Sequence, residues 1–200
     1  METFFHEADR QPRTVAFALC GSFCPFEKVL PVMQTLVQAG WQVLPVLSFN
    51  AAGQNTRFGE AEQWQQRLYA ATGHYPLQTL QQVEPLGPRR MADALVVAPC
   101  TGTTLAKLAL GLSDTPVTLA AKSLLRNGRP VVLALSTNDG LGASAQHIAA
   151  LLNRKHYYFE PFAQDDPLHK PQSLQAEFTL LPDVLELALQ AKQYQPVLLS

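Results

Sequence analysis

The sequence predicts a three-layer α/β protein with a Rossmann-like, doubly wound parallel sheet and helices on both of its faces. Two observations predict it. Apolar runs of strand length alternate with helical patterns along the 200 residues, as they do in right-handed β-α-β units. The runs also lack strict alternation of apolar and polar residues, which is typical of strands covered on both faces.

The expected strands are apolar runs rich in valine, leucine and alanine, and amphipathic segments follow most of them. Two of the predicted helices end at Gly40 and Gly73, which suit the left-handed position after a helix. The strands are expected at residues 14–19, 43–49, 94–98, 130–135 and 157–159, and the helices at 26–39, 61–72, 103–112, 117–126, 142–152 and 173–193.

Prolines cluster between residues 161 and 171. Proline has no amide hydrogen, so this stretch is predicted to be an irregular loop. It would cover a ligand, meet a neighbouring subunit or simply lie on the surface. No repeat or linker interrupts the chain, so we expect a single domain over residues 1–200, with residues 1–12 as a flexible N-terminal segment.

Composition excludes several classes of protein. Fifteen basic and sixteen acidic residues give a net charge of -1, whereas nucleic-acid binding needs a basic face. No segment has the apolar core of a signal peptide or the roughly 18 apolar residues of a membrane helix, so we expect a cytoplasmic protein. Cys20, Cys24 and Cys100 lack a second pair or a nearby histidine to complete a metal site. They are predicted to be buried free thiols, with no metal bound.

Glycine and hydroxyl residues follow the first two predicted strands. In an open parallel sheet, ligands bind beyond the carboxyl ends of the strands. Gly21 and Ser22 follow the first strand and precede a helix, and Ser48 closes the second strand. Glycine permits close backbone approach and a helix start offers free amides to an anion. This turn resembles a phosphate-binding turn in outline, although it is not the G-x-G-x-x-G pattern.

More hydroxyl groups follow the third and fourth strands. Thr101, Thr103 and Thr104 surround the start of a helix, where a single hydroxyl is enough to cap the free amides. The surplus predicts contact with a phosphate or a polar ring edge, and a simple capping cluster is the alternative. Three polar residues follow the fourth strand: Ser136, Thr137 and Asn138. They can hydrogen-bond a heteroaromatic ring or serve as turn residues.

Charged acid-base groups are scarce at these strand ends, and the five histidines form no H-x-x-x-H or H-E-x-x-H pattern. Asn138, in the loop after the fourth strand, is the candidate catalytic residue. A site rich in hydroxyls and poor in acids and bases indicates that a cofactor or another subunit supplies the reactive chemistry.

Residues 98–117, APCTGTTLAKLALGLSDTPV, resemble the signature of the flavoprotein superfamily, which includes flavin-dependent cysteine decarboxylases and flavin prenyltransferases. Narrower motifs, among them TRFG, EPLGP and the QDDPLHKPQSL loop, resemble the B subunits of dipicolinate synthases. The stretches that carry this second resemblance span nearly the whole chain: 21–31, 55–64, 83–88, 120–142, 158–174 and 195–199.

The resemblance implies a flavodoxin-like fold, FMN as cofactor and a role in oxidising dihydrodipicolinate to dipicolinate. It implies an A subunit that binds NADP as partner, a homo-oligomer, and the mother cell of a sporulating bacterium as location. By position, Gly21 and Ser22 match the phosphate-side turn and Ser48 the end of the second strand. Thr101, Thr103 and Thr104 match the helix start at the flavin phosphate, and Ser136, Thr137 and Asn138 the loop that lines the ring.

The chain also departs from its wider relatives. The decarboxylases have a histidine after the second strand, where this chain has only Asn50 to Gly53, and their cysteine-bearing lid is absent. The prenyltransferases have an arginine where Ser136 stands. Two alternatives remain to a role in the synthase: a self-sufficient FMN-dependent decarboxylase or transferase, and a scaffolding protein without catalysis of its own.

Overall fold

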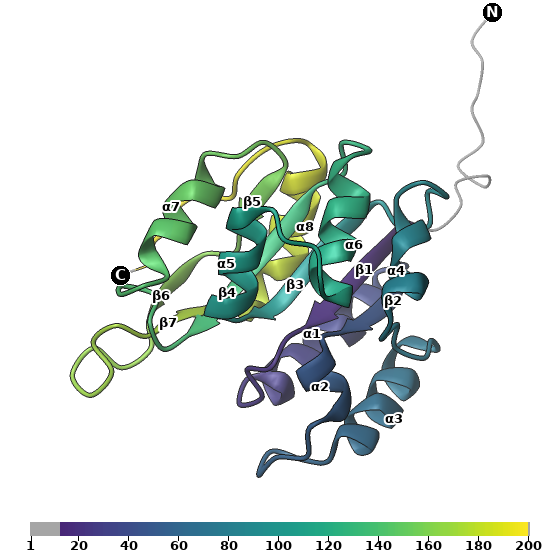
Figure 1. Ribbon diagram of the computed structural model, residues 1–200, viewed down its shortest axis with the longest axis horizontal. Coiled ribbons are helices and arrows are strands. Elements are labelled where there is room, and N and C mark those ends of the chain that lie inside the picture. The colour runs from purple at the N-terminus through teal and green to yellow at the C-terminus, as the bar shows by residue number, and fades with distance from the viewer. Residues whose placement is uncertain (1–12, 200) are drawn as a thin grey trace, which may run out of the picture.

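Four parallel strands form the centre of the sheet in the structure, a computed structural model that describes residues 13–199. Their order across the sheet is β2 (Gln42–Leu47), β1 (Thr14–Leu19), β3 (Ala94–Cys100) and β4 (Val131–Thr137). Helices cover both faces of this sheet (Figure 1). The predicted three-layer, Rossmann-like fold is therefore confirmed.

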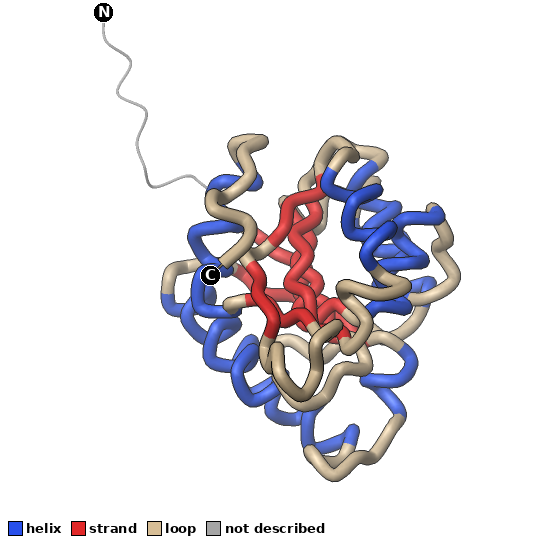
Figure 2. Tube along the Cα trace, turned by 90° about the vertical axis from the view of Figure 1, so that its left-hand side faces the viewer, coloured by secondary structure: helices blue, strands red, loops and turns tan. Residues whose placement is uncertain are grey.

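Each face of the sheet has its own helical layer. Helix α1 packs against α3 and α8 on one face, while α5 packs against α6 and α7 on the other. Figure 2 shows the strands edge-on between these layers. The helices are α1 (Phe26–Gln38), α3 (Ala61–Thr72), α5 (Gly102–Leu110), α6 (Pro116–Leu125), α7 (Ala145–Leu152) and α8 (Leu181–Leu189).

The central strands are buried as their sequences predict. Every residue of β3 and β4 is buried, and so is every residue of β1 after Thr14. Because helices lie on both sides, no face of these strands meets water and the apolar runs need no alternation. Most predicted boundaries shift slightly. Between β2 and β3 the structure has three short elements that the sequence does not predict: α2 (Phe49–Gly53), α4 (Leu80–Val83) and the 3₁₀ turn η2 (Glu84–Leu86).

Part of the stretch predicted as a loop, residues 161–171, belongs to an antiparallel hairpin, although residues 165–171 are irregular as predicted. Strand β6 (Phe162–Gln164) pairs with β7 (Leu174–Ala176), and β7 pairs with the end of β4. The short parallel strand β5 (Tyr157–Phe159) pairs with the beginning of β4. The prolines fall outside the paired segments, in agreement with their missing amide hydrogen, but the prediction of wholly irregular structure is wrong.

The prediction of a single helix over residues 173–193 is also wrong. Its first part forms β7 and the 3₁₀ turn η3 (Phe178–Leu180), and only α8 is helical. Leu174 and Ala176 are buried while Gln175 between them is only partly so, which is the two-residue period of a strand. Pro182 lies in the first turn of α8, where proline is tolerated because that amide lacks a helical partner.

Two of the outer strands in the described sheet, β2 and β6, each pair with one further residue through an isolated β-bridge. Leu77 bridges β2 at Val46, and Leu198 bridges β6 at Phe162. The N–H of Leu47 donates to the carbonyl of Leu77 at 2.9 Å. On the other edge, the N–H of Leu199 donates to the carbonyl of Phe162 at 3.0 Å. Part of the outward-facing backbone of both strands is thereby satisfied.

The cysteines agree with the prediction at two positions of three. Cys20 and Cys100 are buried free thiols, whereas Cys24 is exposed and the prediction of burial is wrong there. Cys24 lies in the turn between β1 and α1, outside the sheet. Burial raises the pKa of the Cys20 thiol to about 11, so this thiol stays protonated.

None of the helices in residues 13–199 has the length and apolar character needed to cross a bilayer. The N-terminal segment that the sequence predicts to be flexible, residues 1–12, lies outside the described residues.

Glu160 is an unusual acid in the interior. Its side chain is completely buried directly after β5, and neither carboxyl oxygen has a hydrogen-bond partner among the described residues. Burial, together with the negative charges of Glu177 and Asp183, raises the pKa of Glu160 to about 9. The carboxyl group is therefore protonated at neutral pH.

Replacing Glu160 by glutamine should change how stability depends on pH. The unfolded chain loses the Glu160 proton near the ordinary value of 4.5, whereas the folded protein keeps it up to about 9. Between these values the folded state holds the extra proton, so the free energy of unfolding falls as pH rises. In thermal melts, E160Q should gain stability relative to the wild type from about pH 5 to about pH 8. The exposed control E62Q should follow the wild type, and parallel curves for E160Q and wild type would contradict a buried neutral acid.

Candidate functional site

The order of the strands places a switch point between β1 and β3. From β1 the chain continues to β2 on one side, and from β3 it continues to β4 on the other. The loops that leave β1 and β3 therefore separate to opposite faces and open a crevice beyond the strand ends. Open α/β sheets bind ligands at this point. Gly21 and Thr101, both singled out from the sequence, follow these two strands.

Two adjacent hollows lie at this crevice, and every predicted site residue borders at least one of them. We call them together the strand-end cradle. Gly21, Thr101 and Thr103 border both hollows, so the two are contiguous. The first has a volume of about 290 Å³ and is also bordered by Ser22, Ser136, Thr137 and Asn138. The second has a volume of about 300 Å³ and is also bordered by Ser48 and Thr104.

The start of α5 offers hydrogen-bond donors to the first hollow. Thr101 caps the helix, because its Oγ1 accepts from the N–H of Thr104 at 3.3 Å. The Thr104 hydroxyl in turn donates to the Sγ of Cys20 at 3.3 Å. Thr103 differs from these two, since its hydroxyl and the amides of Gly102 and Thr103 have no partner among the described residues. The capping interpretation thus accounts for Thr101, while Thr103 keeps its donors free.

Serine side chains connect the loops on either side of β3. The hydroxyl groups of Ser22 and Ser136 lie 2.9 Å apart in a hydrogen bond. Because β3 separates β1 from β4 in the sheet, this contact spans the end of β3. Ser48 has a local role, since its Oγ accepts from the N–H of Ala51 at 3.2 Å and caps α2.

Asp139 is a site residue for which the sequence predicts no role. Its Oδ1 accepts hydrogen bonds from the hydroxyls of Thr137 at 2.5 Å and Ser144 at 2.8 Å. These bonds hold the pKa of the Asp139 carboxyl below its usual range, so the group is ionised at neutral pH. The first hollow therefore contains a fixed negative charge, close to the positive end of the α5 dipole.

Gly102 makes this arrangement possible. A Cβ atom at residue 102 would lie 2.6 Å from the Ser144 Oγ and 2.8 Å from both the Asp139 Oδ1 and the Thr137 Oγ1. The helix start can approach the carboxylate this closely only because Gly102 has no side chain.

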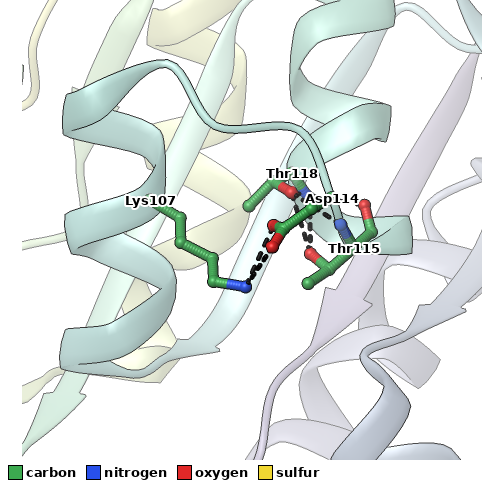
Figure 3. A network of polar contacts seen from close by, with 4 residues as sticks. All are labelled: Lys107, Asp114, Thr115 and Thr118. Carbon is green, nitrogen blue, oxygen red and sulfur yellow. Dashed lines mark hydrogen bonds and ion pairs between the residues drawn. The ribbon is translucent and has the colours of Figure 1, made fainter.

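An ion pair stiffens the wall of the second hollow. Lys107 Nζ lies 2.8 and 2.9 Å from the carboxylate oxygens of Asp114 (Figure 3). Asp114 directly precedes Thr115, which caps α6 by accepting from the N–H of Thr118 at 3.2 Å. Lys107 and Thr115 both border the hollow. The pair connects α5 to the start of α6 and fixes the loop between them.

Most polar groups around the two hollows are neutral; the charged ones are Asp139 and Lys107, and Lys107 is paired with Asp114. Among the described residues, no histidine borders either of them. Within residues 13–199, no three histidine, cysteine, aspartate or glutamate side chains gather as a metal cluster would require. Hydroxyls, amides and one carboxylate can bind and orient a polar ligand, but they provide no free acid-base pair.

A doubly wound sheet whose switch point gathers amides and hydroxyls at a helix start is typical of α/β proteins that bind phosphorylated ligands. Residues 4–175 match the family model described as Flavoprotein. The chain belongs to the flavoprotein family.

Two relatives match nearly the whole chain. The B subunit of dipicolinate synthase from Bacillus subtilis (strain 168) is 43% identical over 188 residues, which cover 94% of each chain. The crystal structure of the corresponding B subunit from Bacillus halodurans is 41% identical with a TM-score of 0.86, covering 94% of this chain and 96% of that one. Within the flavoprotein family, the chain therefore belongs with the dipicolinate synthase B subunits. The FMN-dependent cysteine decarboxylase SpaF shares the fold at 21% identity and a TM-score of 0.62, with coverage of 90% and 97%.

Replacing Gly102 by alanine should disrupt the cradle. The new methyl group would force the Asp139 cluster and α5 apart, at a cost of about 1–3 kcal/mol in the free energy of unfolding. Denaturant unfolding measures this loss. The matched control is G53A, because a Cβ atom at Gly53 meets nothing within 4 Å. Equal stability of G102A and G53A would show that the close approach at Gly102 is not needed.

Proposed function

We propose that this chain binds FMN in the strand-end cradle and acts as the B subunit of a dipicolinate synthase. With an A subunit that binds NADP, it would take part in the oxidation of dihydrodipicolinate to dipicolinate. The observation that carries the proposal is the combination of a near full-length relationship to dipicolinate synthase B subunits with a cradle that gathers every predicted site residue.

The donors around Thr103 fit a phosphate group. The amides of Gly102 and Thr103 and the Thr103 hydroxyl are free of partners among the described residues, and they lie at the positive end of α5. Gly21 and Ser22 border the same hollow from the end of β1. In this proposal these groups hold the FMN phosphate without a lysine or arginine side chain, since Lys107 is already paired with Asp114.

The residues at the end of β4 suit a polar ring system. Ser136, Thr137 and Asn138 border it from the end of β4. Thr137 donates to Asp139, which fixes its hydroxyl, while the Asn138 side chain is exposed and makes no hydrogen bond to a described residue. The Asn138 amide can both donate and accept. We assign it to orienting the substrate or the ring.

Bound FMN would supply reversible electron transfer, which the chain's own residues cannot provide. The contributions of the chain are binding, orientation and charge. The ionised Asp139 lies against Gly102 at the start of α5, where it would hold a fixed negative charge beside the bound cofactor.

Replacing Thr103 by valine tests the phosphate assignment. Valine keeps the shape of threonine and removes a hydroxyl that no described residue uses, so folding should be unaffected. A lost hydrogen bond to a charged phosphate should weaken FMN binding about tenfold. Titration of the purified protein with FMN, followed by visible absorption, measures this change. T35V on the exposed surface of α1 is the matched control, and equal affinity of T103V and T35V would remove Thr103 from the site.

The role in the synthase is tested by assaying dihydrodipicolinate oxidation with the A subunit alone, this chain alone and the two together. We expect full activity only with both chains. N138A should lower turnover of the pair while leaving the thermal stability of this chain unchanged. Full activity of the A subunit alone would refute the proposed role. Turnover by this chain alone would instead favour a self-sufficient enzyme, and unchanged turnover of N138A would favour a scaffolding role.

A further inference from the structure

A larger cavity lies near the beginning of the strands, away from the strand-end cradle. Its volume is about 530 Å³, which is in the range of small-molecule sites. It is bordered by the end of α5 and the residues after it, by one side of α6 from Thr118 onward, and by the loop residues 154–156, which lead into β5. The carbonyl of His156 in this loop accepts from the N–H of Val131, the first residue of β4. The cavity is therefore beside the beginning of the strands, whereas the cradle is beyond their ends.

The interior of the cavity offers apolar surface. Leu108 and Leu112 border it from α5 and the residues after it, Leu125 from α6, and Tyr157 from β5. Burial raises the pKa of Tyr157 to about 12, so its phenol group remains neutral at physiological pH. These side chains can contact the body of an organic molecule but cannot neutralise a charge.

The charged groups at the cavity are all basic. Lys122 and Arg126 come from α6, and Arg154 and Lys155 come from the loop before β5. No acidic residue in the described part of the chain borders the cavity. Arg126 reaches Glu84 only at 4.0 Å, and the other three have no acidic partner within 4.0 Å among the described residues. In a chain of net charge -1, this concentration of positive charge is local.

One of these groups is held in place. The Arg154 guanidinium donates to the carbonyl of Leu108 at 3.2 Å and to that of Ala109 at 2.5 Å, at the end of α5. These bonds fix the arginine without neutralising it, because carbonyl groups carry no net charge. A positive group held in advance loses less conformational entropy when an anion binds.

We propose that this cavity binds a small organic dianion with an apolar body, of which an aromatic dicarboxylate is the best-fitting class. The basic groups come from two separate elements, so they can engage two anionic groups of one ligand while the leucines and Tyr157 contact its ring. The class follows from the cavity alone. The choice of dipicolinate as the first probe rests on the proposed function. If that function holds, the cavity would be a product or effector site distinct from the cradle.

Calorimetric titration at low salt tests the proposal with dipicolinate, isophthalate and benzoate. Isophthalate has the same two carboxylates without the ring nitrogen, and benzoate has only one. Both dicarboxylates should bind, and benzoate should bind at least about tenfold more weakly. The double variant K122Q/R126Q should lose about tenfold or more in affinity for both dicarboxylates. The control K192Q, on an exposed lysine that does not border the cavity, should bind as the wild type does.

The remaining measurements separate this site from the cradle. T103V and N138A should bind isophthalate as the wild type does, and K122Q/R126Q should take up FMN normally. Absence of dicarboxylate binding at millimolar concentration, or equal binding by the double variant, would overturn the proposal. A change of oligomeric mass in K122Q/R126Q would overturn it as well, because the cavity would then be an interface between copies. Failure of the proposed function would show itself separately, as absence of FMN uptake or of any effect on the A subunit.

Discussion

The strand-end cradle depends on the burial of β3 between two neighbouring strands and two helical layers. All residues of β3 are buried, so this strand cannot shift without exposing apolar surface on both faces of the sheet. The start of α5 is thereby fixed relative to the loops after β1 and β4. The contact between Ser22 and Ser136 above the end of β3 is possible because all three strand ends have set positions. Donors held in this way need little ordering when a ligand arrives.

Two acids in the chain show how environment decides ionisation. Asp139 receives hydroxyl donors and lies at the start of a helix, and both effects favour its charged form. Glu160 is enclosed without a partner among the described residues and has other acids nearby, which favours its neutral form. The first acid contributes a negative charge to the cradle. The second contributes no charge at neutral pH, and its extra proton makes stability fall as the pH rises from about 5 toward about 9.

The sequence identified the cradle because its hydroxyl residues directly follow long apolar runs, such as Ser136 after the fourth strand. Contacts between residues that are distant in the sequence could not be predicted from such local patterns. Gly102 and Asp139 are far apart in sequence, and only the fold reveals that the glycine makes room for the carboxylate cluster.

The hairpin was missed for a different reason. Strands as short as β6 and β7 carry too few residues for a two-residue period to stand out from the neighbouring prolines. The start of α8 did carry a signal, Pro182, although the apolar residues on both sides of it resembled one long helix. The cavity at the beginning of the strands combines side chains from three separate segments, which no local pattern indicates. Its basic residues are scattered along the sequence and converge only in the fold.

The bridges at the two outer strands bear on how this chain can associate with others. Leu77 and Leu198 each occupy hydrogen-bonding groups that a further strand would need, and Pro45 within β2 has no amide hydrogen to donate. Edge strands protected in this manner resist the strand-by-strand addition that leads to aggregation. At β2 and β6, an approaching strand therefore meets few backbone groups that are free to pair.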